Sequence, residues 1–140
     1  MDKYKFLPHT ADTKFQAFGK DVEEAFSNSA LALTDVVVEQ KDIQNTKTKT
    51  LFLQSEDLKS LLYDFLEKIL LLMENEHFVV SAVHALKIDH GKRYILSAEL
   101  QGDVGIEKYD YKRTVKAVTY NDMVIDQKPD KTTIEVVLDL

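Results

Sequence analysis

The sequence predicts one α+β domain over residues 1–140, strand-rich, with largely antiparallel sheets layered against two helices. Short segments with alternating apolar residues precede, separate and follow two segments whose apolar residues recur at helical spacing. The second helical segment, roughly 56–75, is apolar on almost every side, so it should be buried on both sides. Two flanking layers are the natural way to bury such a helix, which makes the expected fold sandwich-like.

Alternation of apolar and polar residues marks the strands. In the last strand this alternation continues to Leu140. In the 78–88 segment the apolar face also contains His84, which we expect to be a buried histidine with a hydrogen-bonding partner rather than a metal ligand. The expected strands are 4–6, 13–18, 50–54, 78–88, 93–100, 112–120, 123–126 and 132–140.

Capping signals mark the starts of both helices. Asp21 and Glu24 have the spacing of a capping box, which predicts a first helix from Asp21 to about Asp35. Residues 40–47 are polar and are expected to form a loop. Ser55 is the expected N-cap of the second helix, because acidic residues follow it where the helix dipole favours them.

Composition excludes several classes of function. The chain has no cysteine, which rules out a disulfide framework, thiolate zinc sites and cysteine nucleophiles. Its net charge is −6 and its lysines are scattered, whereas direct nucleic-acid binding needs a basic face. The longest apolar run, 69–72, is too short to span a bilayer, and the N-terminal residues lack the apolar region of a signal peptide. We therefore expect a cytoplasmic protein without membrane contact.

The hexapeptide LPHTAD, residues 7–12, concentrates polar chemistry between two strand-like segments. Asp12 follows a proline-interrupted stretch, where the backbone leaves regular pairing. It is open to two interpretations. One is a residue that caps neighbouring backbone amides at the entry to a strand. The other is a functional acid.

The last residues, VLDL, are the second candidate. Terminal residues usually fray, but here the alternation should tie the end of the chain into a sheet. That would hold the Asp139 carboxylate beside the α-carboxylate of Leu140, and two adjacent carboxylates need a cation or hydrogen-bond donors nearby. Hard oxygen ligands favour Ca²⁺, Mg²⁺ or Mn²⁺ over zinc. The alternative is a solvated acidic end. Lys116 is either an outward-facing strand lysine or a cation near these carboxylates.

Four motifs occur together in this chain, and together they resemble the archease family over essentially its whole length. The helix segment LKSLLYDFLEKIL also resembles the second helix of that family. One residue departs from the pattern, because KAVTY is usually followed by histidine in the family and here by Asn121. The motifs are LPHTAD (7–12), GKDVEEAFSNSALAL (19–33), KAVTY (116–120) and VVLDL (136–140).

The resemblance implies an α+β fold with helices layered against sheets, and a protein that is not an enzyme. It implies an activating partner of the RtcB-type RNA ligase of tRNA splicing and RNA repair. Such a ligase uses GTP and a divalent metal to guanylylate one of its own histidines, and archease promotes that step and multiple turnover.

The resemblance also implies the site. It puts the metal ligands on Asp12, Asp139 and Leu140, the last through main-chain oxygen, with His9 and Lys116 as site neighbours. The expected cofactor is a divalent cation, calcium first, with magnesium or manganese as alternatives.

Two other functions stay open. A small metal-dependent hydrolase could use two acids and a divalent ion to activate water. A general chaperone or adaptor would need an exposed apolar surface.

Overall fold

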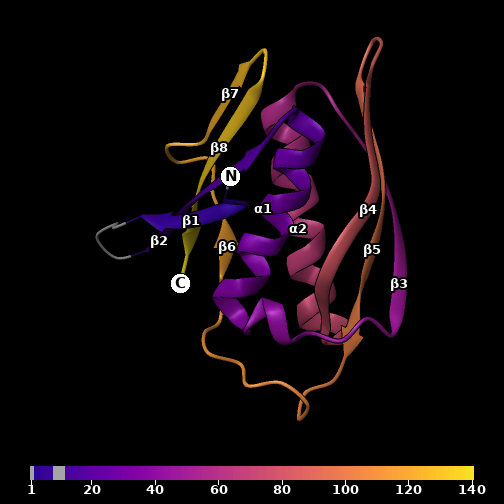
Figure 1. The fold of residues 1–140 in the computed structure, drawn as a ribbon, viewed down its shortest axis with the longest axis vertical. Coiled ribbons are helices and arrows are strands. Elements are labelled where there is room, and N and C mark those ends of the chain that lie inside the picture. Colours follow the sequence, from indigo (N-terminus) through magenta and orange to yellow (C-terminus); the bar gives the residue numbers. More distant parts are fainter. Residues whose placement is uncertain (1, 8–11) are drawn as a thin grey trace.

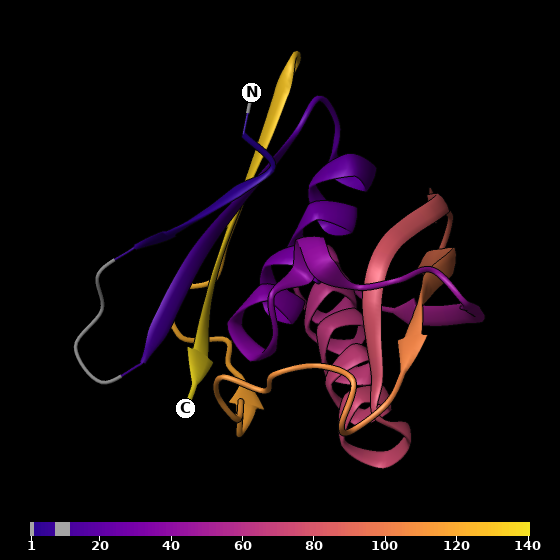
Figure 2. The same ribbon diagram turned by 60° about the horizontal axis from the view of Figure 1, so that its bottom comes forward.

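The computed structural model describes residues 2–7 and 12–140, which form three layers. Two helices lie side by side in the middle layer, with one sheet on each side of them (Figures 1 and 2). The α+β class and the two flanking sheets are as predicted. The elements are β1 (Tyr4–Leu7), β2 (Thr13–Gly19), α1 (Val22–Val37), a 3₁₀ helix (Gln40–Asp42), β3 (Lys47–Ser55), α2 (Leu58–Glu76), β4 (Phe78–His90), β5 (Tyr94–Val104), β6 (Ala117–Val118), β7 (Val124–Lys128) and β8 (Lys131–Asp139).

Both sheets are antiparallel throughout their described strand pairs. In the five-stranded sheet the order is β1-β2-β8, and both β6 and β7 pair with the free side of β8. In the three-stranded sheet the order is β3-β5-β4. The first sheet therefore joins the two ends of the sequence, whereas the second is built from the middle of the chain.

The core lies between the two sheets. Its largest members include Phe26 of α1 and Phe65 of α2, whose rings are 6.0 Å apart and fully buried. Helix α2 contacts strands of both sheets, which explains why it is apolar on nearly every side. Its buried residues are Leu61, Leu62, Phe65, Leu66, Ile69, Leu70, Leu72 and Met73.

The predicted capping box at the start of α1 is present. Asp21 accepts a hydrogen bond from the Glu24 backbone N–H at 2.9 Å. The Glu24 carboxylate in turn accepts from the backbone N–H of Lys20 at 3.0 Å. These bonds satisfy backbone donors that a helix N-terminus would otherwise leave without partners.

The predicted cap of α2 is wrong. Ser55 is the last residue of β3, and its hydroxyl donates to Asp64 at 2.7 Å. The N-cap is Asp57, which accepts from the Ser60 backbone N–H at 2.8 Å. Ser55 and Asp57 both have side chains that can cap a helix. Because β3 extends as far as Ser55, the cap is Asp57.

The prediction of a buried His84 is also wrong, because β4 does not alternate regularly. The pairing with β5 shifts between Val80 and Ala82, which sets Val83 opposite the buried Leu100 and His84 opposite Glu99. This shift changes which residues face the core, so His84 is exposed. A second shift follows between His84 and Lys87, at a bulge where Ala85 has a φ of 52° in the left-handed region. The Glu23 carboxylate of α1 accepts from the Ile88 backbone N–H at 3.1 Å, just after the bulge.

The expected strand at 112–120 is reduced to β6, Ala117–Val118. The residues before it cross from one sheet to the other without forming a strand (Figure 2). Lys112 donates its backbone N–H to the carbonyl of Val37 at 2.7 Å, so this segment occupies the C-terminal end of α1.

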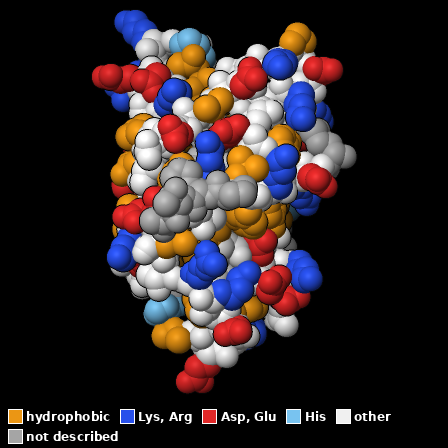
Figure 3. Space-filling view, turned by 90° about the vertical axis from the view of Figure 1, so that its left-hand side faces the viewer, with side chains coloured by type: hydrophobic (Ala, Val, Ile, Leu, Met, Phe, Trp, Pro, Cys, Tyr) orange, Lys and Arg blue, Asp and Glu red, His pale blue; other side chains and the backbone are white. Residues whose placement is uncertain are grey.

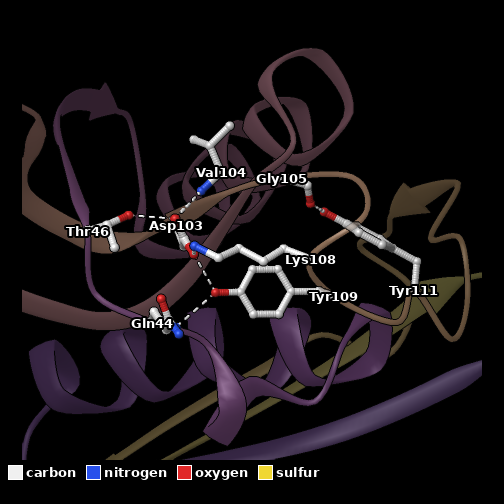
Figure 4. A network of polar contacts seen from close by, with 8 residues as sticks. All are labelled: Gln44, Thr46, Asp103, Val104, Gly105, Lys108, Tyr109 and Tyr111. Atoms are coloured by element: carbon white, nitrogen blue, oxygen red, sulfur yellow. Dashed lines mark hydrogen bonds and ion pairs between the residues drawn. The ribbon is translucent and has the colours of Figure 1, made fainter.

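A buried carboxylate, Asp103, anchors the beginning of this crossing (Figure 4). It accepts hydrogen bonds from Lys108 Nζ at 2.8 Å, from Thr46 Oγ1 at 2.5 Å and from Tyr109 Oη at 2.5 Å. These donors, Lys108 foremost, hold the pKa of Asp103 well below its usual range. The network ties the loop after β5 to the segment before β3.

No helix within residues 2–7 and 12–140 combines the length and apolar character needed to cross a bilayer.

Candidate metal site

Residues near the beginning and the end of the sequence lie side by side where β2 pairs with β8. Thr13 is opposite Leu138 in that ladder. Asp12 lies in a bend directly before Thr13, and Asp139, the last residue of β8, directly follows Leu138. The two acids therefore adjoin the same pair of opposed residues, whose Cα atoms are neighbours across the ladder. The fold therefore brings the two sequence-predicted acids to one corner of the sheet.

Strand β6 completes this corner from the other side of β8. Ala117 pairs with Asp139, and the backbone N–H of Lys116 donates to the Asp139 carbonyl at 2.8 Å. In both ribbon views β6 lies next to the C-terminal end of the chain (Figures 1 and 2). Lys116 is exposed, which is compatible with both of its interpretations. Its contact with the site is through its backbone.

The other two predicted site residues are Leu140 and His9. Leu140 is half-buried and packs against the core, so the end of the chain is held against the sheet. His9 lies outside the described residues.

The donor set of this corner suits a hard cation. In the part of the chain that the structure describes, no three His, Asp or Glu side chains gather in a way that could hold a metal ion. The corner instead offers the carboxylates of Asp12 and Asp139 and the main-chain oxygens of Leu140. Oxygen donors of this kind fit Ca²⁺, Mg²⁺ or Mn²⁺. Asp139 is exposed, which leaves the corner accessible to a second molecule.

A third acid on the same face, Glu135, is already neutralised. Its carboxylate accepts from Gln16 Nε2 at 2.7 Å and pairs with Lys14 Nζ at 3.1 Å. The hydrogen bond from Gln16 and the charge of Lys14 lower the pKa of Glu135. Glu135 is therefore a structural acid and does not add to the candidate ligands.

An arginine beside the corner has no part in the sequence-based interpretation. Arg113 Nη1 donates to Thr13 Oγ1 at 3.3 Å, which places a guanidinium one residue from Asp12. The basic run YKR at 111–113 is the sequence signal that could have located it. Arg113 also borders a hollow of about 360 Å³. The hollow is lined by Phe6, Leu7, Thr13, Asp35, Val36, Lys112 and Arg113.

Charges of both signs are interspersed on the face shown in Figure 3. Among the described residues of that face, Lys and Arg side chains are mixed with Asp and Glu side chains and do not form one continuous basic surface. A phosphate backbone requires a continuous basic surface, so this face is poorly suited to bind RNA directly.

The comparisons with known proteins identify relatives over nearly the whole chain. The sequence model of the archease protein family (MTH1598/TM1083) matches residues 4–140. Protein archease of Methanosarcina barkeri is 39% identical over 145 residues, which cover 99% of this chain and 96% of that protein. Protein archease of Thermococcus kodakarensis is 39% identical over 133 residues, covering 93% of this chain and 92% of that protein.

Two solved structures share the fold. The solution structure of Methanobacterium thermoautotrophicum protein 1598 superimposes with a TM-score of 0.85 at 32% identity, and the match covers 100% of both chains. The crystal structure of an archease from Thermotoga maritima, described as a possible chaperone, has a TM-score of 0.62 at 20% identity. That match covers 97% of this chain and 96% of the other, and at such low identity it concerns the fold alone.

Proposed function

The chain belongs to the archease family, and from that premise we propose that it is a non-enzymatic activator of an RtcB-type tRNA-splicing RNA ligase. In this proposal it promotes the ligase's metal- and GTP-dependent guanylylation, and so its repeated turnover in tRNA splicing and RNA repair.

One observation supports the proposal: Thr13 is opposite Leu138 in the β2–β8 ladder, so their chain neighbours Asp12 and Asp139 lie at the same corner of the sheet. Two carboxylates held close together repel each other, and a cation bound between them removes that repulsion. Leu140 packs against the core beside them and adds main-chain oxygen. We assign the divalent cation of the proposal, calcium first and magnesium or manganese as alternatives, to these three residues.

A cation held there would place positive charge next to phosphate oxygens. Phosphoryl transfer requires such a charge, because negative charge on these oxygens must be stabilised during the reaction. The chain's own residues have a positioning role in this proposal. Asp12 and Asp139 hold the cation, and the hydrogen bond from Lys116 to the Asp139 carbonyl keeps the end of β8 in place. The RNA and the reacting histidine belong to the ligase.

The proposal is tested by assaying guanylylation of a purified cognate ligase with the wild-type protein, Asp12→Asn and Asp139→Asn. Both variants should lose most of the stimulation, because the amide side chains keep the shape but remove the charge. Asp89→Asn is the matched control, since Asp89 is an exposed acid on β4 in the other sheet. Equal stimulation by all four proteins would refute the metal corner as the means of activation.

Cation binding has its own measurement, which does not depend on the ligase. Adding Ca²⁺, Mg²⁺ or Mn²⁺ to the isolated protein should raise its melting temperature, and Asp12→Asn should abolish that rise. The same samples test the hydrolase alternative, because GTP turnover by the isolated protein that disappears in Asp12→Asn would favour an enzyme.

A general chaperone is the second candidate, and it would act through exposed apolar side chains such as Phe52 and Ile106. The discriminating measurement is suppression of the aggregation of unrelated proteins. Suppression as strong for unrelated proteins as for the ligase would favour the chaperone, and suppression confined to the ligase would favour the activator.

A further inference from the structure

Two tyrosines from distant parts of the sequence form a stacked pair on the surface. The rings of Tyr63, on α2, and Tyr120, after β6, are nearly parallel at 7°, with centroids 4.5 Å apart. Tyr120 is nevertheless 52% exposed. One face of its ring rests on Tyr63, and the rest of the side chain borders an open hollow of about 520 Å³. The hollow is lined by Asp57, Leu58, Lys59, Ser60, Tyr120, Ile125 and Gln127.

Carboxylates surround this pair. Burial, followed by the charges of Asp64 and Asp57, raises the pKa of the Tyr120 hydroxyl. Burial, followed by a hydrogen bond to Glu67, raises the pKa of Tyr63. Both tyrosines therefore lie in a field of negative charge, which one lysine at the rim, Lys59, reduces but does not cancel.

The N-terminus of α2 does not reverse this charge. A free helix N-terminus attracts anions through its unpaired N–H groups. Here Asp57 already accepts from the Ser60 backbone N–H at 2.8 Å and from the Ser60 hydroxyl at 2.7 Å. The first turn of the helix thus presents a carboxylate to the hollow.

We propose that this surface, Tyr120 stacked on Tyr63 with the carboxylates of Asp57, Asp64 and Glu67 around it, binds an arginine-bearing segment of a partner protein. A guanidinium within about 6 Å of a tyrosine ring centroid is attracted by the negative face of the ring. The same planar group donates several hydrogen bonds to carboxylates. Tyr120 and Asp57 both line the hollow, so an arginine side chain bound there could contact an aromatic ring and a carboxylate at the same time. Asp64 and Glu67 lie outside the lining and contribute through their charge.

The chemistry favours arginine over the alternatives. Aromatic stacking alone would also accept a base of single-stranded RNA, but the acids would repel its phosphates. A lysine is attracted by the carboxylates but gains less from the ring, because its ammonium is more strongly hydrated. The inference rests on the proposed function in one respect, since an RNA ligase must itself present basic residues to its substrate.

The tyrosine pair and the metal corner can be covered by one partner. Ala117 pairs with Asp139, and Tyr120 is three residues further along the chain, so its Cα atom is at most about 11 Å from that of Ala117. The backbone N–H of Thr119 donates to the Val137 carbonyl at 3.2 Å, which fixes the intervening turn to β8. In the proposed complex the tyrosine pair binds the surface of the partner, and the metal corner lies at the active site of the partner.

The first experiment titrates the ¹⁵N-labelled full chain by NMR with a peptide of four arginines spaced by glycine, and with the matched lysine peptide. The arginine peptide should shift resonances of Tyr63, Tyr120 and Ser60 and should bind more tightly than the lysine peptide. Tyr120→Leu should weaken the arginine peptide about fivefold to tenfold, the size of a partly desolvated cation–π contact. Glu67→Gln, an exposed change on the same surface, should weaken it as well.

Phe52→Leu is the control for loss of an exposed ring, because Phe52 is 62% exposed on β3 in the other sheet. It should bind the arginine peptide as the wild type does. Equal affinity of the arginine and lysine peptides, or unchanged affinity of Tyr120→Leu, would overturn the inference. Displacement of the peptide by a single-stranded RNA oligomer from the same resonances would also overturn it.

The second experiment measures the affinity of a cognate ligase for the same variants and separates the two proposals. A wild-type protein that fails to stimulate the ligase refutes the proposed function, whatever the peptide result. A wild-type protein that stimulates, together with Tyr120→Leu that binds the ligase equally well, refutes the role of the tyrosine pair and leaves the metal corner intact.

Discussion

At Gly102 one added methyl group should disturb the packing of the three-stranded sheet and lower the stability of the protein. It lies in the central strand β5, opposite Lys47 of β3 and Val80 of β4. A Cβ atom built there would be 1.9 Å from the carbonyl oxygen of Val79 and 3.1 Å from the ring of Phe78. The obstacle is backbone, so it cannot rotate away, and β4 and β5 would have to separate by more than 1 Å, about the difference between that distance and a normal contact.

The magnitude follows from this geometry. Overpacking of a filled site costs about 1–3 kcal/mol, and a clash with backbone falls at the upper end. Alanine also lowers the conformational entropy of the unfolded chain, which stabilises the folded state by about 0.4–1 kcal/mol. The net loss for Gly102→Ala is therefore about 2 kcal/mol of unfolding free energy. An unfolding entropy of about 2.1 cal/mol/K per residue over 140 residues converts this into a melting temperature about 7 °C lower.

Gly91→Ala is the matched control, because a Cβ at Gly91 would meet no atom within 4 Å. That variant should be slightly more stable than the wild type, by about 0.5 kcal/mol or roughly 2 °C, through the unfolded state alone. Differential scanning calorimetry of the three proteins measures both effects. Equal melting temperatures for Gly102→Ala and the wild type would refute the clash and the strand packing it is based on.

Three further predictions concern other local features. Asp103→Asn should lower the melting temperature at pH 7. The difference in melting temperature from the wild type should shrink as the pH falls below about 3.8. The reason is that a carboxylate whose pKa is lowered by folding loses its stabilising effect as it is protonated. Melting curves from about pH 7 to about pH 2.5 measure this change. Asp57→Ala should cost about 1 kcal/mol in urea unfolding through loss of the α2 cap, whereas Glu56→Ala, at an exposed neighbour, should change it by less than about 0.5 kcal/mol. Ala85→Gly should raise the unfolding free energy by about 0.5–1 kcal/mol by relieving a left-handed alanine, and a lower value in the same urea experiment would contradict that strain.

The layered fold was accessible from sequence because its signals are long and repeated. A helix as apolar as α2 has few solutions other than burial between two layers, and both sheets are indeed packed against it. The last strand likewise repeats its apolar residues often enough to define its face, and Ile134, Val136 and Leu138 are buried as the alternation requires. Such patterns average over many residues, so one misleading position does not change the result.

The errors fall where one residue decides the outcome. Ser55 and Asp57 are both good caps, and the choice between them depends on how far β3 continues along β5, which is a property of the sheet. His84 lies on an apolar face only if β4 alternates without interruption. The register shift between Val80 and Ala82, which turns His84 outward, depends on the pairing of β4 with β5 and has no glycine to mark it in the sequence.

The candidate site depends on the core for its geometry. Asp12 and Asp139 are far apart in sequence, and no local pattern relates them. What brings them to one corner is the register of β2 against β8, in which buried Phe15 is opposite Val136 and buried Ala17 is opposite Ile134. A slip of one residue would turn these apolar side chains to solvent and would also move Thr13 away from Leu138, so the energy that holds the core also fixes the strand residues next to the two acids. A site proposed to present a cation to another protein gains from this, because its supporting strands are held by the core.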